Sequence, residues 1–141
     1  MQTAVRTALL VALLLAGSCV PSSAGGPPQG QGPTLAELMK QPANRAAWYG
    51  MFAGETPPPW IDIYAKTLDG PPTPSITVEA NGETYTLGFT CKPNECGNNQ
   101  LFVLFSASGA KAWSLLQTGD QKKWFGSPDK SVQDAILSSI D

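Results

Sequence analysis

The alternation of apolar and polar positions is clearest in residues 75–89, where it predicts a β-hairpin. Asn81 and Gly82 lie at its centre and supply the two positive-φ residues of a type I′ turn. The turn sets a register that pairs like with like: Val78 with Tyr85, Ile76 with Leu87, Thr77 with Thr86, and Glu79 with Thr84. Because the apolar pairs share one face, the pattern indicates a ribbon that is buried on one side.

Three further segments predict strands after this hairpin. Residues 101–105 are continuously apolar, as expected of a central strand that is covered on both faces. Residues 111–117 predict the next strand, with Trp113 and Leu115 on one side, and residues 122–125 predict a short edge strand. Together with the hairpin, these segments predict an antiparallel sheet of four or five strands.

Helical patterns precede the sheet. Thr34 and Glu37 have the spacing of a capping box, which satisfies free backbone amides at a helix start. Residues 43–52 show a helical pattern whose apolar face holds Trp48, Met51 and Phe52, while Asn44 and Arg45 are expected to point outward. The following segment, residues 60–64, fits either a short strand or a packed loop, and periodicity alone does not decide between them.

A last helix is predicted after the sheet. Ser127, Pro128 and Asp129 provide an N-cap and a proline for its first turn. Its apolar face consists of Val132, Ala135, Ile136 and Ile140. The expected fold class is α+β: one domain with an antiparallel sheet and flanking helices.

The N-terminus predicts export. Residues 1–24 contain Arg6, an apolar run and then small residues, which is the order of a secretory signal peptide cleaved after Ala24. The alternative is a lipoprotein signal of residues 1–18, because the segment before Cys19 also fits a bacterial lipobox in which Cys19 is acylated. Both alternatives place the protein in the periplasm, either soluble or anchored to the envelope by a lipid.

The mature chain is expected to have two parts. Residues 25–33 (GGPPQGQGP) cannot bury apolar surface and predict a flexible tether. Residues 34–141 are long enough to form one hydrophobic core and are predicted to form the folded domain.

The amino-acid composition limits the kinds of catalytic site, metal site and partner that are possible. The chain has no histidine, so an imidazole cannot serve as a general base or a metal ligand. Its carboxylates are scattered without a spacing that pairs them, and we therefore expect no enzyme, no metal and no cofactor. Loss of Arg6 with the signal peptide leaves 8 basic residues against 11 acidic ones, a net charge of −3. This balance argues against a nucleic-acid partner and favours a basic one.

The four tryptophans are candidates for the lining of a sugar-binding groove. Trp48 and Trp113 lie on apolar faces and are expected in the core. Trp60 and Trp124 follow proline or lysine, and either is a candidate for a partly exposed anchor.

The strongest candidate for a functional site is the segment between Cys91 and Cys96. Either treatment of Cys19 leaves these two cysteines as an even pair in an exported chain, which makes a disulfide the expected state. Closing so short a loop constrains the unfolded chain by only about 2 kcal/mol. One interpretation of the disulfide is a purely structural role, in which it only holds the end of the sheet together. The other is a rigid polar projection, which gains affinity because its ordering cost is paid before association.

The sequence CKPNECG, between the NGETYTLGFT strand and an apolar strand, resembles the inhibitor of vertebrate lysozyme (Ivy) family, whose signature loop is CKPHDC or a near variant. The similarity extends in outline from the first helix to the last. It implies a periplasmic or envelope-anchored protein that inserts the disulfide-tied loop into the active-site cleft of a C-type lysozyme. The resemblance also implies an action on the cell's own lytic transglycosylases.

The resemblance also implies roles for the loop residues. Cys91 and Cys96 match the family's disulfide, Lys92 and Pro93 match the residues that shape the projection, and Glu95 keeps the acidic character of the family's aspartate. Asn94 stands where the family has a histidine that contacts the catalytic carboxylates. An amide still donates hydrogen bonds but carries no charge, so inhibition is expected to be about tenfold weaker.

A second function is compatible with the same scaffold. Under this second hypothesis, the chain is an envelope binding protein with weak or no lysozyme inhibition, and it acts on lytic transglycosylases or peptidoglycan fragments. Contact with a membrane is expected only through a lipid on Cys19.

Overall fold

The computed structural model describes residues 30–141. The predicted signal peptide, Cys19 and the first five residues of the expected tether lie outside the described residues. At the end of that tether, the Gly32 amide donates to the Ser75 carbonyl and the Ser75 amide to the Pro33 carbonyl, both at 3.0 Å. The residues just before the expected domain boundary therefore lie beside the segment that leads into the sheet.

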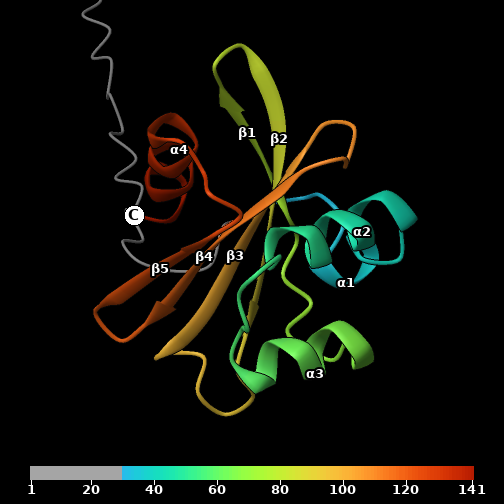
Figure 1. Ribbon diagram of the computed structural model, residues 1–141, viewed down its shortest axis with the longest axis vertical. Helices are drawn as coiled ribbons and strands as arrows, with labels where there is room; N and C mark the ends of the chain where they lie inside the picture. The colour runs from blue at the N-terminus through green and yellow to red at the C-terminus, as the bar shows by residue number, and fades with distance from the viewer. Residues whose placement is uncertain (1–29) are drawn as a thin grey trace, which may run out of the picture.

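A five-stranded antiparallel sheet forms the centre of the fold (Figure 1). Its strands lie side by side in sequence order: β1 Ile76–Ala80, β2 Glu83–Cys91, β3 Asn99–Ser106, β4 Ala112–Thr118 and β5 Gln121–Phe125. Each consecutive pair is a hairpin, so β1 and β5 form the two edges. The expected edge position of residues 122–125 is confirmed.

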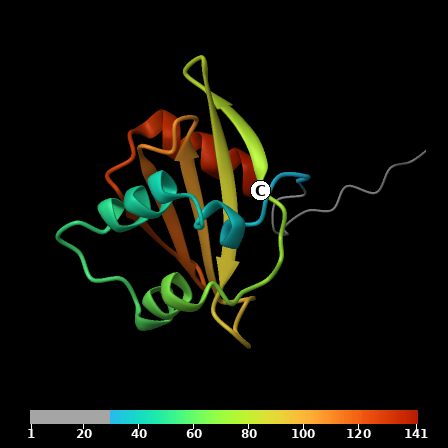
Figure 2. The ribbon, with the colours of Figure 1, turned by 90° about the vertical axis from the view of Figure 1, so that its right-hand side faces the viewer.

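Helices cover both faces of this sheet. Before it in sequence come α1 Leu35–Leu38, α2 Pro42–Met51 and α3 Pro59–Thr67, and after it comes α4 Lys130–Ile140. Figures 1 and 2 place α1, α2 and α3 on one face and α4 on the other. The α+β fold class is confirmed. None of the helices within residues 30–141 has both the length and the apolar character needed to cross a membrane.

The hairpin prediction is confirmed residue by residue. Val78 pairs with Tyr85, Ile76 with Leu87, Thr77 with Thr86, and Glu79 with Thr84. Asn81 and Gly82 have φ values of 53° and 74°, as a type I′ turn requires. The register is correct because a two-residue turn leaves only one way to place the apolar pairs on the same face.

The continuous apolar run in β3 reflects burial on both faces. Leu101, Val103 and Phe105 pack with residues of α1, α2 and α3, whereas Phe102 and Leu104 pack against the face covered by α4. All five are at most 3% exposed. Alternating side chains of this one strand therefore hold the two helical layers together.

Residues 60–64 form neither a strand nor a loop but the first half of α3. Pro59 occupies the first turn, where its missing N–H costs nothing. The buried residues Trp60, Ile61, Tyr64 and Ala65 have helical spacing, which a five-residue window was too short to display. Trp60 is only 9% exposed, so its assignment as a surface anchor was wrong.

Two smaller expectations, about the direction of Asn44 and the position of Pro128, were also wrong. Asn44 does not point outward: it is 4% exposed, and its Nδ2 donates to the Leu38 carbonyl at 3.1 Å. The side chain thus satisfies a carbonyl at the end of α1, which a hydrophobic pattern does not reveal. Pro128 precedes the N-cap of α4 instead of lying in its first turn, because Asp129 is the capping residue and accepts from the Val132 amide at 2.9 Å.

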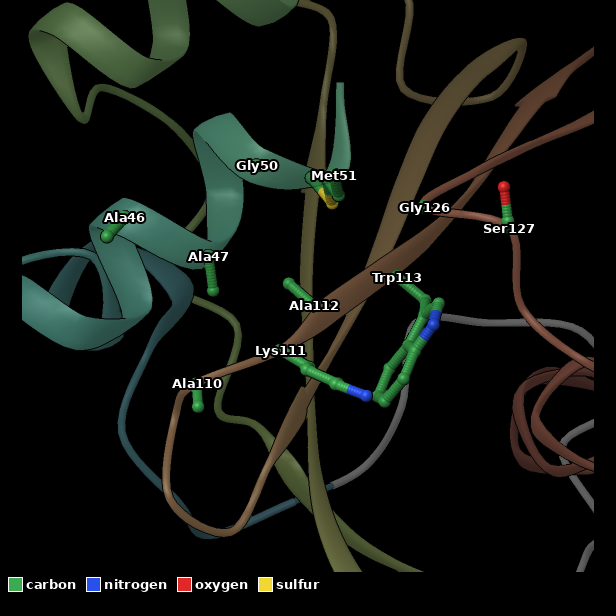
Figure 3. Close-up of a pocket in the computed structure, with 10 residues that line it drawn as sticks. All are labelled: Ala46, Ala47, Gly50, Met51, Ala110, Lys111, Ala112, Trp113, Gly126 and Ser127. Atoms are coloured by element: carbon green, nitrogen blue, oxygen red, sulfur yellow. The ribbon is translucent and has the colours of Figure 1, made fainter. Parts of the chain in front are cut away.

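Gly126 connects β5 to the segment that leads into α4, and it lies against α2 and β4 (Figure 3). Its φ is +84°, and a Cβ there would lie 2.7 Å from the Ala112 carbonyl oxygen and 3.2 Å from Met51 Cβ. We expect Gly126→Ala to lower the free energy of unfolding by about 3 kcal/mol, from backbone strain and overpacking together. Urea denaturation measures this loss.

Gly119 is the matched control for this substitution. It also has a positive φ of +57°, but a Cβ there would meet no atom within 4 Å. Gly119→Ala should therefore cost only the left-handed strain of about 1 kcal/mol. Equal losses for the two variants would show that contact with Ala112 and Met51 contributes nothing.

Candidate functional site

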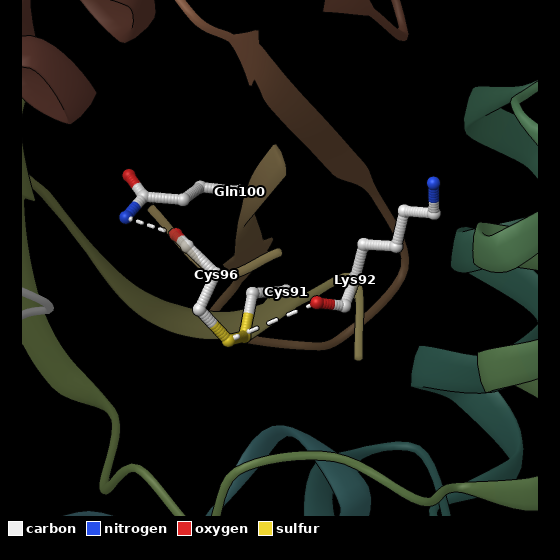
Figure 4. Close-up of a disulfide and its surroundings, with 4 residues drawn as sticks. All are labelled: Cys91, Lys92, Cys96 and Gln100. Carbon is white, nitrogen blue, oxygen red and sulfur yellow. Dashed lines mark hydrogen bonds between the residues drawn. A yellow bond between two sulfur atoms is a disulfide. The ribbon is translucent and has the colours of Figure 1, made fainter. Parts of the chain in front are cut away.

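The tied loop, defined here as residues 91–96, begins at the last residue of β2 and lies within the connection to β3. The Cys91–Cys96 disulfide is present, as the sequence predicts, with a Cα–Cα distance of 4.9 Å (Figure 4). Cys91 is buried against the α4 face of the sheet, while Cys96 is exposed. The loop is thus fixed at one end in the core and projects beyond the end of the sheet (Figure 2).

A β-turn of residues 92–95 forms the tip of this loop. The Glu95 amide donates to the Lys92 carbonyl at 3.0 Å and closes the turn. Pro93 occupies the second position, and Asn94 occupies the third with φ 64°. A proline followed by a residue with positive φ is typical of a type II turn, in which the third position is favourable only for glycine and a few residues such as asparagine. Asn94 therefore has a backbone role as well as a side chain to present.

Further hydrogen bonds hold the loop to the sheet. The amides of Asn98 and Asn99 both donate to the Glu95 carbonyl, at 3.0 and 2.9 Å, and the Lys92 amide donates to the Asn99 carbonyl at 3.0 Å. Gln100 Nε2 donates to the Cys96 carbonyl at 2.9 Å (Figure 4). The Gly119 amide, in the turn between β4 and β5, donates to the Asn98 carbonyl at 2.9 Å. The loop is consequently braced from both adjoining hairpins.

The charges on the tip compensate each other. Lys92 and Glu95 form an ion pair across the turn, with side chains that are 41% and 46% exposed. A pair this exposed adds little stability. Asn94 is the neutral polar residue between these two opposite charges in the sequence. Its side chain makes no hydrogen bond within residues 30–141.

An apolar hollow of about 270 Å³ lies between the tied loop and α3. We call it the loop hollow; its lining residues are Trp60, Ile63, Tyr64, Asp69, Cys91, Lys92 and Pro93. Ile63 is 59% exposed although it lines this hollow. Burial raises the pKa of the Tyr64 hydroxyl, so this side chain is neutral at physiological pH.

A larger hollow of about 470 Å³ lies between α2 and β4 and contains no residue of the loop (Figure 3). Its lining is mostly small: Ala46, Ala47, Gly50, Ala110, Ala112 and Gly126 are among the residues around it. Within the described residues, no group of three or more aspartate, glutamate or cysteine side chains is placed to hold a metal ion.

The structure places the predicted loop residues together at the exposed tip, and their role in binding stays a prediction. Sequence reasoning missed the loop hollow, because it did not place a helix at residues 59–67 or bring that helix to the loop. The buried spacing of residues 60, 61, 64 and 65 is the signal that would have found the helix. No local signal pairs this helix with a loop about thirty residues later.

Comparison with known proteins identifies the family. Residues 43–137 match the sequence model of the family described as Inhibitor of vertebrate lysozyme (Ivy). A Pseudomonas aeruginosa protein named Inhibitor of vertebrate lysozyme is 32% identical over 124 residues, which cover 77% of this chain and 78% of the relative. The protein of the same name from Escherichia coli K12 is 32% identical over 89 residues, 63% of this chain and 54% of the relative. An uncharacterised Yersinia pestis protein is 28% identical over 77% of each chain. Because the family match spans more than half of the sequence, this chain belongs to the inhibitor of vertebrate lysozyme (Ivy) family.

Proposed function

We propose that this protein inhibits C-type lysozyme by placing the turn of residues 92–95 in the active-site cleft of the enzyme. The observation that carries the proposal is the shape of the tied loop: an exposed type II turn closed by a disulfide and braced by backbone hydrogen bonds. The names of the relatives from Pseudomonas and Escherichia support a lysozyme as the partner.

Preorganisation explains how such a loop binds tightly. Ordering a free chain costs about 1–2 kcal/mol per residue, and this cost is subtracted from the affinity of a flexible loop. In the tied loop the ordering has already occurred during folding. Contacts made inside the cleft then contribute to affinity with little conformational entropy cost to subtract.

Asn94 supplies the polar contact at the tip. Glycoside hydrolysis depends on two carboxyl groups that flank the scissile bond. The Asn94 amide has two N–H donors, no partner within the described residues and a position held by the turn. Hydrogen bonds from it to one or both carboxyl groups would occupy the catalytic centre and exclude substrate. The protein itself needs no catalytic group for this action.

Charge supports the choice of partner. The described residues contain 8 basic and 11 acidic side chains, a net charge of −3. An acidic inhibitor is steered towards a basic lysozyme, and this raises the association rate at low salt. The disulfide supports an oxidising compartment, and we place the protein in the periplasm, either soluble or anchored by a lipid on Cys19.

A turbidity assay tests the proposal. The oxidised, exported form is mixed with a C-type lysozyme, and lysis of muramidase-sensitive cells is followed as light scattering. We expect a dose-dependent loss of lysis that saturates when the inhibitor exceeds the enzyme. Undiminished lysis at a large excess of folded protein would contradict the proposal. Binding to a lytic transglycosylase under those conditions would instead favour the envelope binding protein.

A further inference from the structure

We infer that the loop hollow receives an apolar side chain from the rim of the lysozyme cleft, and that Ile63 is a contact residue of this second anchor point. The inference rests on the proposed function, because it assigns the surface beside the inserted turn. It adds a contact on α3, a helix that is separate in sequence from the tied loop.

Geometry places the hollow at the edge of the inserted segment. Cys91 and the first two residues of the turn, Lys92 and Pro93, line the hollow. An enzyme that takes the turn into a concave site must surround it with its rim. The part of the rim on the α3 side would then face the hollow, because Lys92 and Pro93 of the inserted turn line the hollow together with α3 residues.

The apolar lining and the volume of the hollow determine which kind of side chain can occupy it. Trp60, Ile63, Tyr64 and Pro93 are among its lining residues, and its surface is mostly apolar. A cavity of about 150 Å³ with apolar walls accommodates a benzene molecule, so about 270 Å³ is enough for one leucine or phenylalanine side chain. Lys92 and Asp69 also line the hollow, and charged groups beside an apolar centre are usual in protein interfaces.

Ile63 is the residue that reports on this contact. It is 59% exposed although its neighbours on α3, Trp60, Ile61 and Tyr64, are at most 9% exposed. Its exposed position means that truncation leaves the core intact. A partner side chain seated in the hollow would cover much of the surface that Ile63 now presents to water, and that burial favours the complex.

The test compares Ile63→Ala with Tyr49→Ala. Tyr49, on α2, is the other large apolar side chain that is strongly exposed in the described part of the chain, at 49%, and it does not line the loop hollow. We expect Ile63→Ala to raise the inhibition constant for C-type lysozyme about fivefold and Tyr49→Ala to leave it unchanged. Alanine is a good helix former, so both variants should keep their unfolding midpoints.

A second measurement gives a readout other than inhibition. In protein labelled at isoleucine δ1 methyl groups, addition of unlabelled lysozyme should shift the Ile63 signal. The Ile76 signal should not move, because Ile76 lies on the α4 face and pairs with Leu87, away from the loop end of β2. If wild type inhibits but Ile63→Ala and Tyr49→Ala behave alike and the Ile63 methyl does not shift, the inference is overturned and the proposed function stands. If wild type does not bind lysozyme, the proposed function fails and the inference fails with it.

Discussion

Replacing Cys96 by alanine should raise the inhibition constant about a hundredfold while the five-stranded sheet remains folded. Opening the disulfide frees four residues, 92–95, whose ordering costs about 1–2 kcal/mol each. Part of that order survives because the turn and the hairpin base keep their backbone hydrogen bonds. A residual ordering cost of about 3 kcal/mol corresponds to the hundredfold loss.

Cys96 is a better site for this test than Cys91. Cys91 is 3% exposed and packs in the core beside Phe89 and Phe102, so a change there would disturb the fold as well as the loop. Cys96 is exposed, and its replacement should lower the free energy of unfolding by only about 2 kcal/mol. Urea denaturation measures that loss, and the turbidity assay measures inhibition. An inhibition constant equal to that of wild type would show that preorganisation of the loop does not matter.

Asn94→His should lower the inhibition constant about tenfold at pH 5.5. An imidazolium makes charge-assisted hydrogen bonds to carboxylates, which contribute about 1.5–3 kcal/mol against about 0.5–1.5 kcal/mol for neutral ones. The backbone accepts the change, because histidine is among the residues enriched at positive φ, where Asn94 has 64°. Asn94→Gly is the matched control: it keeps the turn and removes the donor, and it should weaken inhibition.

The gain from histidine should depend on pH in a defined direction. A carboxylate partner raises the pKa of an imidazole above its usual value of about 6.5. The extra affinity is therefore complete below about pH 6.5 and declines as pH rises through the higher pKa of the complex. The wild-type chain has no histidine, so the ratio of the two inhibition constants isolates this effect from titration of the enzyme. A ratio of one from pH 5 to pH 8 would mean that the tip does not face the catalytic carboxyl groups.

The parts of the fold that were predictable are those set by neighbouring residues. Asn81-Gly82 dictates the hairpin register, and the two-cysteine spacing identifies the loop, because both depend on chemistry within a few positions. Helix α3 was missed because its buried face spans six residues and holds three aromatic or β-branched residues that also suit strands. The loop hollow was missed because it forms only when α3 and the end of β2 meet in space.

The backbone of the turn explains why the tip admits so few alternatives. A residue at φ 64° can be asparagine, aspartate, histidine or glycine at modest cost, whereas a branched side chain would strain or open the turn. The exposed side chain at the third position of the turn is therefore restricted to a very small set of residue types. Divergence in partner preference among proteins built this way must then accumulate around the tip, on surfaces such as α3 whose sequence the turn does not restrict.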